Sequence, residues 1–174
     1  MNTLAHTWLE RAATATREAP QDDVRYAFTL PIGAQRTLAR GWLWLAIAAL
    51  VGSGLFSLLL VLSRTPGVNR WLPGVDFFRV ALVVHVDLSV AVWFMAFAAV
   101  IWCAVGGSGL ALLGWSGVGL AALGTALMSV SPFFPGAEPV LNNYIPVLRQ
   151  PLFFASLWIL AAGASLTVLR ALIT

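Results

Sequence analysis

The sequence contains no lysine, one cysteine and two histidines, and only seven of its 174 residues are acidic. Charged residues make up 10% of the chain and hydrophobic residues 60%, whereas soluble domains carry about a quarter charged residues. Together with a mean hydropathy of +0.87, this composition excludes a soluble globular domain and indicates a lipid bilayer as the solvent. The lone Cys103 lies inside an apolar run, so it offers neither a disulfide nor a zinc site.

The basic residues are all arginine, and the sequence isoelectric point is near 10.0. A basic chain can be a nucleic-acid-binding protein, but these arginines are scattered and lie mostly near the ends of apolar runs. Positive charge that flanks spans is the usual membrane pattern. We therefore expect the membrane as a partner and no nucleic acid.

Four apolar runs are long enough to cross a bilayer, which takes about 20 helical residues. They cover residues 41–62, 77–105, 109–130 and 151–173. Only the stretch GGSG separates the second and third runs, which predicts a tight antiparallel hairpin of helices. The connection between the third and fourth runs is longer, aromatic and rich in proline, and we expect it to lie along the membrane surface.

The fold class predicted from these runs is an all-α membrane protein with four transmembrane helices, formed by residues 39–174. Residues 1–38 are polar and lack the apolar stretch of a signal peptide, so we expect a retained cytoplasmic tail. The side that holds both termini carries six arginines against four, which predicts cytoplasmic N- and C-termini. Five glycines in the runs are expected to be sites of close helix packing: Gly52, Gly54, Gly114, Gly117 and Gly119.

His85 and Asp87 lie well inside the second run, although ionisable groups are costly inside a membrane and are usually functional. His85 is about 12 Å from the outer end of the run, at 1.5 Å per residue. On a regular helix its face would form a shallow trough in which a flat macrocycle could lie, with its iron bound to the imidazole. The neighbours on that face are Phe78, Ala81, Leu82, Leu88, Ser89 and Ala96.

Both residues also have simpler interpretations. His85 could only form a hydrogen bond to a neighbouring helix. Asp87 is about 200° round the helix from His85, so it cannot orient the imidazole directly. We expect its carboxylate to accept hydrogen bonds from a neighbouring hydroxyl or indole group, with a proton relay as the alternative.

The stretch FFRVALVVHVDLSVAVWFMAFAAVIW, residues 77–102, resembles the second transmembrane helix of subunit I in the haem–copper oxidase and nitric oxide reductase superfamily. The likeness is greatest to the cbb3-like and nitric-oxide-reductase-like branches. The segment NNYIPVLRQPLFF, residues 142–154, resembles the connection into the fourth helix of such proteins. The resemblance covers roughly residues 37–173, so it implies that the chain matches the first helices of a twelve-helix subunit.

The resemblance implies a site at His85. The imidazole would be one axial ligand of the iron of a low-spin, b-type haem, and Ala81 and Ser89 would border the haem. Arg79 would contact a haem propionate, although an interfacial arginine that holds lipid headgroups is the alternative. The family's copper centre and second haem ligand need further histidines, and this chain has only His6 besides His85. The haem would therefore be shared with another chain, and this chain would not be catalytic alone.

The implied function is the haem-binding part of a respiratory terminal oxidase, similar to subunit I of cytochrome c oxidase, in a bacterial cytoplasmic membrane. The expected partners are a chain with the remaining subunit I helices, other oxidase subunits and a cytochrome c. A chain that ends directly after the fourth run is what a split subunit would show, and the alternative is a truncated relative of subunit I. The alternatives are the same role in a nitric oxide reductase, or a non-redox membrane scaffold.

The predicted orientation can be tested by labelling single cysteines with a membrane-impermeant reagent in intact cells. A cysteine at Ser108 should be protected and one at Gly67 should react, because the two positions lie in connections on opposite sides of the membrane. The reverse pattern would contradict the orientation with both termini in the cytoplasm.

Overall fold

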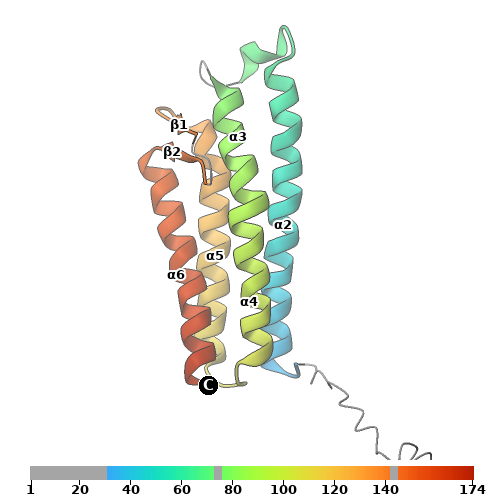
Figure 1. The fold of residues 1–174 in the computed structure, drawn as a ribbon, viewed down its shortest axis with the longest axis vertical. Helices are drawn as coiled ribbons and strands as arrows, with labels where there is room; N and C mark the ends of the chain where they lie inside the picture. The colour runs from blue at the N-terminus through green and yellow to red at the C-terminus, as the bar shows by residue number, and fades with distance from the viewer. Residues whose placement is uncertain (1–30, 73–75, 142–144) are drawn as a thin grey trace, which may run out of the picture.

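The computed structural model describes residues 31–72, 76–141 and 145–174, and these residues form a bundle of four long helices (Figure 1). The first and last of them are α2, Ala34–Ser63, and α6, Pro151–Ile173. The second is continuous through α3, Phe77–Asp87, the π-helical turn η2, Leu88–Val92, and α4, Trp93–Val105. The third is α5, Ala111–Val130, which continues into the 3-10 turn η3, Ser131–Phe133. A 3-10 helix, η1, Val68–Trp71, follows α2.

All four helices are long and apolar enough to cross a membrane, so the predicted helical fold with four candidate spans is confirmed. The second and fourth helices have the predicted bounds, residues 77–105 and 151–173. However, α2 begins at Ala34 and not at residue 41. Arg36 and Arg40 are both exposed, so their side chains can extend from the helix toward water while the backbone stays helical.

The tail predicted over residues 1–38 can be assessed only at its end. Residues 1–30 lie outside the described residues, whereas residues 34–38 belong to α2. Gly33, the residue before the helix, has a φ of 59°, a left-handed conformation that glycine adopts readily. The start of α2 and the C-terminus lie at the same end of the bundle, which we call the terminal end (Figure 1).

The helices are not arranged as the short GGSG connection suggested. The GGSG connection joins α4 directly to α5. The two helices do not pack against each other, however, because each lies between α2 and α6. Going round the bundle, the order is therefore α2, α3–α4, α6, α5, and α4 and α5 are diagonal to each other. The prediction that α4 and α5 pack against each other as a tight hairpin is wrong. Small residues let α5 pack closely against α6, and α5 therefore does not pack against α4.

The connection between α4 and α5 forms hydrogen bonds with two other helices, α2 and α6. Arg170 of α6 is fully buried, and its guanidinium donates to the carbonyl oxygens of Gly107 at 2.5 Å and Gly109 at 3.0 Å. Gln35 of α2 donates to the carbonyl of Gly106, and the Gly107 amide donates to the Thr174 hydroxyl at 3.0 Å. Arg170 was counted with the arginines that face the cytoplasm, but it instead satisfies backbone carbonyls inside the fold.

Glycines set the distance between α5 and α6. A methyl group added at Gly124 would lie 2.6 Å from the backbone nitrogen of Leu160 and 2.7 Å from the carbonyl oxygen of Ser156. Close packing was predicted correctly for Gly52, Gly114 and Gly117, which have neighbours within 3.3 Å of such a methyl group. It was wrong for Gly54 and Gly119, which have nothing within 4 Å.

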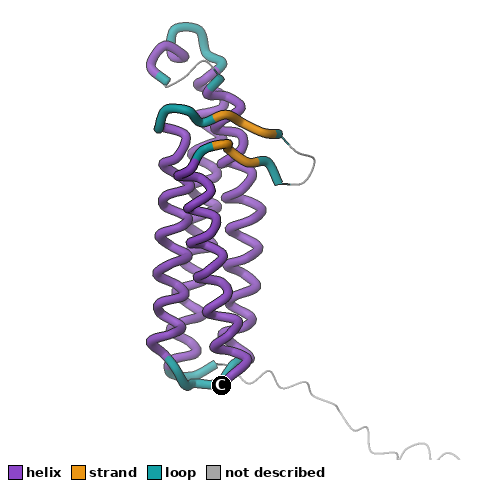
Figure 2. Tube along the Cα trace, turned by 90° about the vertical axis from the view of Figure 1, so that its left-hand side faces the viewer, coloured by secondary structure: helices purple, strands orange, loops and turns teal. Residues whose placement is uncertain are grey.

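The connection from α5 to α6 contains a two-stranded antiparallel hairpin, which the prediction of an all-α fold did not include. Its strands are β1, Glu138–Val140, and β2, Val147–Arg149, with Glu138 opposite Arg149. Figure 2 shows the strands near the end of the bundle that lies opposite the terminal end. The Gln150 side-chain amide donates to the carbonyls of Phe134 and Pro135, which ties the start of α6 to the same connection. We call this end of the molecule the hairpin end.

Two structural features affect the choice of cysteine positions and the background in the labelling experiment. Gly67 has a φ of 87°, so a cysteine there would be strained, and the exposed Pro66 in the same turn is a better position. The native Cys103 is fully buried between helices, so it should not react with a membrane-impermeant reagent.

Substitution of Gly124 by alanine should destabilise the bundle, because the new methyl group would overlap the backbone of α6 and push the helices apart. Overpacking of this kind costs about 1–3 kcal/mol. The matched control is Gly119→Ala on the same helix, where the methyl group meets nothing within 4 Å. Thermal unfolding in detergent should show a lower midpoint for Gly124→Ala only, and equal midpoints would show that this contact does not hold α5 against α6.

Candidate functional site at His85

The His85 side chain is fixed against α2 by Ser53. Its Nδ1 atom lies 2.9 Å from the Ser53 carbonyl oxygen and 2.9 Å from the Ser53 hydroxyl oxygen. The same hydroxyl group donates to the His85 carbonyl oxygen at 3.0 Å. Ser53 is buried and His85 is half-buried, so the pair joins α2 and α3 at the edge of the helix packing.

These hydrogen bonds determine which ring nitrogen can bind a ligand. A carbonyl oxygen can only accept, so Nδ1 carries the proton and donates to Ser53. In the neutral imidazole, Nε2 then keeps its lone pair. Within the described part of the chain Nε2 makes no hydrogen bond, and it is not one of the fully buried polar atoms that lack a partner. It is therefore an accessible nitrogen with a free lone pair.

A π-helical turn begins directly after Asp87 and changes the direction of the residues that follow. Bonds between residues i and i+5 place one extra residue in the turn, so side chains beyond it are rotated by about 100° from a regular helix. The Ser89 hydroxyl donates to the carbonyls of His85 at 2.8 Å and Val86 at 3.2 Å. The placement of Ala96 below His85 assumed a regular helix and is wrong for this reason.

The predicted trough is only partly present. Ala81 and Ala96 are fully buried within the chain itself, so neither borders an open surface. Phe78, Leu82 and Ser89 are half-buried and share one face of the helix with His85. The face open to a ligand is therefore formed by Phe78, Leu82, His85 and Ser89, and we call it the His85 face.

Arg79 lies on a different side of α3. It is six residues from His85, which is about 240° round the helix. Its side chain is mostly exposed, and its Nε atom lies 3.3 Å from a carboxylate oxygen of Asp76. The arginine at the hairpin end of the His85 face is instead Arg64, whose guanidinium carbon lies 4.0 Å from the centroid of the Phe78 ring.

The sequence-based interpretation missed both Ser53 and Arg64. Ser53 stands between two glycines in the apolar run VGSGLF, and a hydroxyl inside a span was the available signal. Its pairing with His85 depends on how α2 and α3 are aligned. Arg64 immediately follows α2, and its approach to Phe78 depends on the same alignment.

Asp87 is fully buried, and neither of its carboxylate oxygens has a hydrogen-bond donor among the described residues. The expected hydroxyl or indole donor is therefore not found there. The buried hydroxyls of α5 and α6 donate to carbonyls of their own helices, as Thr125 does to Ala121 and Ser156 to Phe153. An unsatisfied buried polar group costs about 1–3 kcal/mol, and Asp87 carries this cost unless a donor outside the described residues pairs with it.

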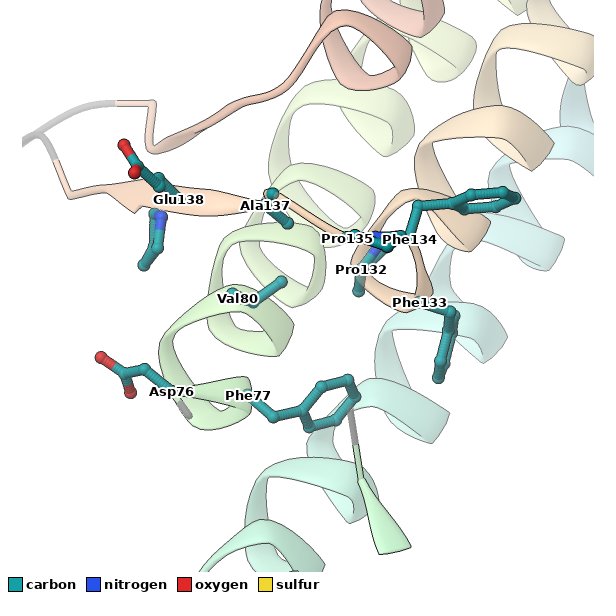
Figure 3. Close-up of a pocket in the computed structure, with 11 residues that line it drawn as sticks. Asp76, Phe77, Val80, Pro132, Phe133, Phe134, Pro135, Ala137 and Glu138 are labelled. Carbon is teal, nitrogen blue, oxygen red and sulfur yellow. The ribbon is translucent and has the colours of Figure 1, made fainter. Parts of the chain in front are cut away.

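A separate cavity of about 420 Å³ lies at the hairpin end, between the start of α3 and residues 132–139 (Figure 3). The rings of Phe77 and Phe133 lie 5.8 Å apart at its apolar side. At the other side are the carboxylates of Asp76 and Glu138, which lie near Arg79 and Arg149 respectively. The cavity is not lined by His85, so it does not belong to the His85 face.

Metal binding by the protein alone is not supported in the described ranges. They contain no group of three or more histidine, cysteine, aspartate or glutamate side chains that could hold a metal ion. A metal ion held by His85 would need its other ligands from outside these residues.

Asp87→Leu should raise the free energy of unfolding by about 2 kcal/mol, because it removes a buried carboxyl group without a donor and keeps the branched shape of the side chain. Asp87→Asn is the control, because it retains a buried polar group and should change stability little. Thermal unfolding in detergent measures both variants. A marked loss of stability in Asp87→Leu would show that a donor beyond the described residues, or a bound water, satisfies the carboxylate.

The chain is similar to two longer proteins. It is 30% identical over 147 residues to the uncharacterized protein RP382 of Rickettsia prowazekii, covering 70% of this chain and 28% of that protein. It is also 30% identical over 129 residues to an uncharacterized protein of Aquifex aeolicus, covering 74% of this chain and 32% of that protein. The chain thus spans about three tenths of the length of the curated relatives it matches. No family model matches the chain, and no solved structure matches it.

Proposed function

We propose that this chain is the haem-binding part of a respiratory haem–copper terminal oxidase in a bacterial cytoplasmic membrane, with both termini in the cytoplasm. His85 supplies one axial ligand of a low-spin, b-type haem, and a partner chain supplies the remaining subunit I helices. The observation that carries the proposal is the hydrogen bond from His85 Nδ1 to the Ser53 carbonyl, which leaves the Nε2 lone pair accessible.

The residues present fit one axial ligand. A metal-binding histidine usually donates its other ring N–H to a carbonyl or carboxylate, which fixes the ring and raises its basicity. Ser53 does this for His85 from a neighbouring helix. The half-buried Phe78, Leu82 and Ser89 provide an apolar and slightly polar surface beside it. Ala81 was expected to contact the haem, but its burial within the bundle removes it from this surface.

The second axial ligand must come from a partner. The only other histidine in the sequence is His6, far along the chain from the membrane helices, and the described residues contain no group of potential metal ligands. The segment similar to this chain makes up 28% of one relative and 32% of the other, so both relatives contain further residues beyond it. Further helices in such a partner would complete the site, together with other oxidase subunits and a cytochrome c as electron donor.

The chain's own part in the reaction is to bind and orient. A low-spin haem held by His85 would supply electron transfer. Ser53 holds the imidazole, and His85 would bind the haem iron through Nε2. Because the copper ligands are absent from this sequence, reduction of dioxygen would take place in the partner helices. The same role in a nitric oxide reductase uses the same residues.

Replacement of His85 by alanine tests the proposal. In the complex purified from membranes, His85→Ala should abolish the low-spin haem absorbance, while the chain still inserts, since losing a polar group from a span does not hinder insertion. The matched control is His6→Ala, which removes the only other histidine and should leave the spectrum unchanged. His85→Met should retain haem with a raised reduction potential, because methionine ligation raises it in cytochromes.

The opposite result is equally informative. If His85→Ala leaves the visible spectrum and electron transfer unchanged, His85 is not a haem ligand. The chain would then be a non-redox scaffold subunit in which the Ser53–His85 contact serves only to pack α2 against α3.

A further inference from the structure

The His85 face extends toward the hairpin end, where the positively charged side chain of Arg64 lies. Phe78 is seven residues before His85, within about 20° of it round the helix and about 10 Å closer to the hairpin end. The segment between them is regular α-helix, so this geometry is not disturbed by the π turn. Arg64 reaches across from the end of α2, and its guanidinium lies over the Phe78 ring at 4.0 Å.

The contact with Phe78 holds the guanidinium in place but does not neutralise it. A cation over an aromatic face is attracted to the ring, while its N–H groups stay free to donate. Arg64 makes no ion pair with the described residues, whereas Arg79 pairs with Asp76 and Arg149 lies near Glu138. Of these three arginines, Arg64 alone lies on the His85 face and makes no ion pair within residues 31–72, 76–141 and 145–174.

We infer that Arg64, and not Arg79, binds a carboxylate of the ligand that His85 holds. This inference rests on the proposed function, because a haem carries carboxylate groups at one edge of an otherwise apolar ring. A ligand bound at His85 can direct such an edge along the face toward the aqueous boundary, where Arg64 lies. The planar guanidinium is suited to two parallel hydrogen bonds with a carboxylate.

The expected effect is on the reduction potential of the haem. Loss of a positive charge disfavours the reduced state, which carries one more electron, so Arg64→Gln should lower the potential. A unit charge about 10 Å away, at an effective dielectric constant near 20, changes such an equilibrium about tenfold. A tenfold change corresponds to about 59 mV for a one-electron couple. Arg64→Lys keeps the charge and should restore most of the shift.

The experiment is a redox titration of the low-spin haem in the purified complex, together with its haem-to-protein ratio. The variants are Arg64→Gln, Arg64→Lys and Arg79→Gln, with Arg149→Gln as the control for loss of a charge elsewhere at the hairpin end. A lowered potential in Arg64→Gln alone, restored in Arg64→Lys, supports the inference. A shift that follows Arg79→Gln, or an equal shift in all the glutamine variants, overturns it.

The His85→Ala variant separates the two proposals. If His85→Ala abolishes the haem signal and Arg64→Gln leaves the potential and haem content unchanged, the haem site stands and the role of Arg64 is wrong. If His85→Ala has no effect on the haem signal, the proposed function fails, and the inference about Arg64 fails with it.

Discussion

Backbone hydrogen bonding within a bilayer constrains this chain more than any other factor, because lipid offers no partner to a free N–H or C=O group. Four long helices satisfy the constraint along most of their length. Where the backbone departs from a regular helix, a side chain donates to its carbonyl groups. The Ser89 hydroxyl does so at the π turn after Asp87, and Arg170 does so at the connection between α4 and α5.

The same constraint applies to the polar side chains of the core, which also need hydrogen-bond partners. Arg170 is fully buried, yet it donates to two carbonyls and is thereby part of the fold. His85 is hydrogen-bonded to Ser53 and is half-buried. Asp87, two residues away, is buried without a donor among the described residues. These three groups show that burial alone does not identify a binding residue, since only His85 of the three is both hydrogen-bonded and half-buried.

Small residues determine how the helices come together. Lipid is as apolar as leucine, so helices associate through close packing more than through exclusion from water. Gly117, Gly124 and Gly163 bring α5 and α6 into backbone contact, and this draws α5 away from α4 despite the short connection between them. The resulting order of helices leaves α2 beside α3, which is the contact that places Ser53 against His85 and Arg64 over Phe78. The proposed site thus depends on packing that occurs elsewhere in the bundle.

The sequence by itself determined the number of spans, the bounds of the second and fourth helices, and the presence of a histidine within the second. Those properties follow from runs of apolar residues, which a bilayer selects by length and composition alone. The extension of α2 to Ala34, the π turn and the strands of the connection could not be predicted, because short-range sequence patterns do not show which backbone groups will find partners. Only the tertiary structure decided that Ser53 fixes the His85 tautomer, that Ala81 is buried and that Arg64 rather than Arg79 lies at the end of the His85 face. Each of these depends on the rotation and alignment of one helix against another, and that alignment arises from contacts between residues far apart in the chain.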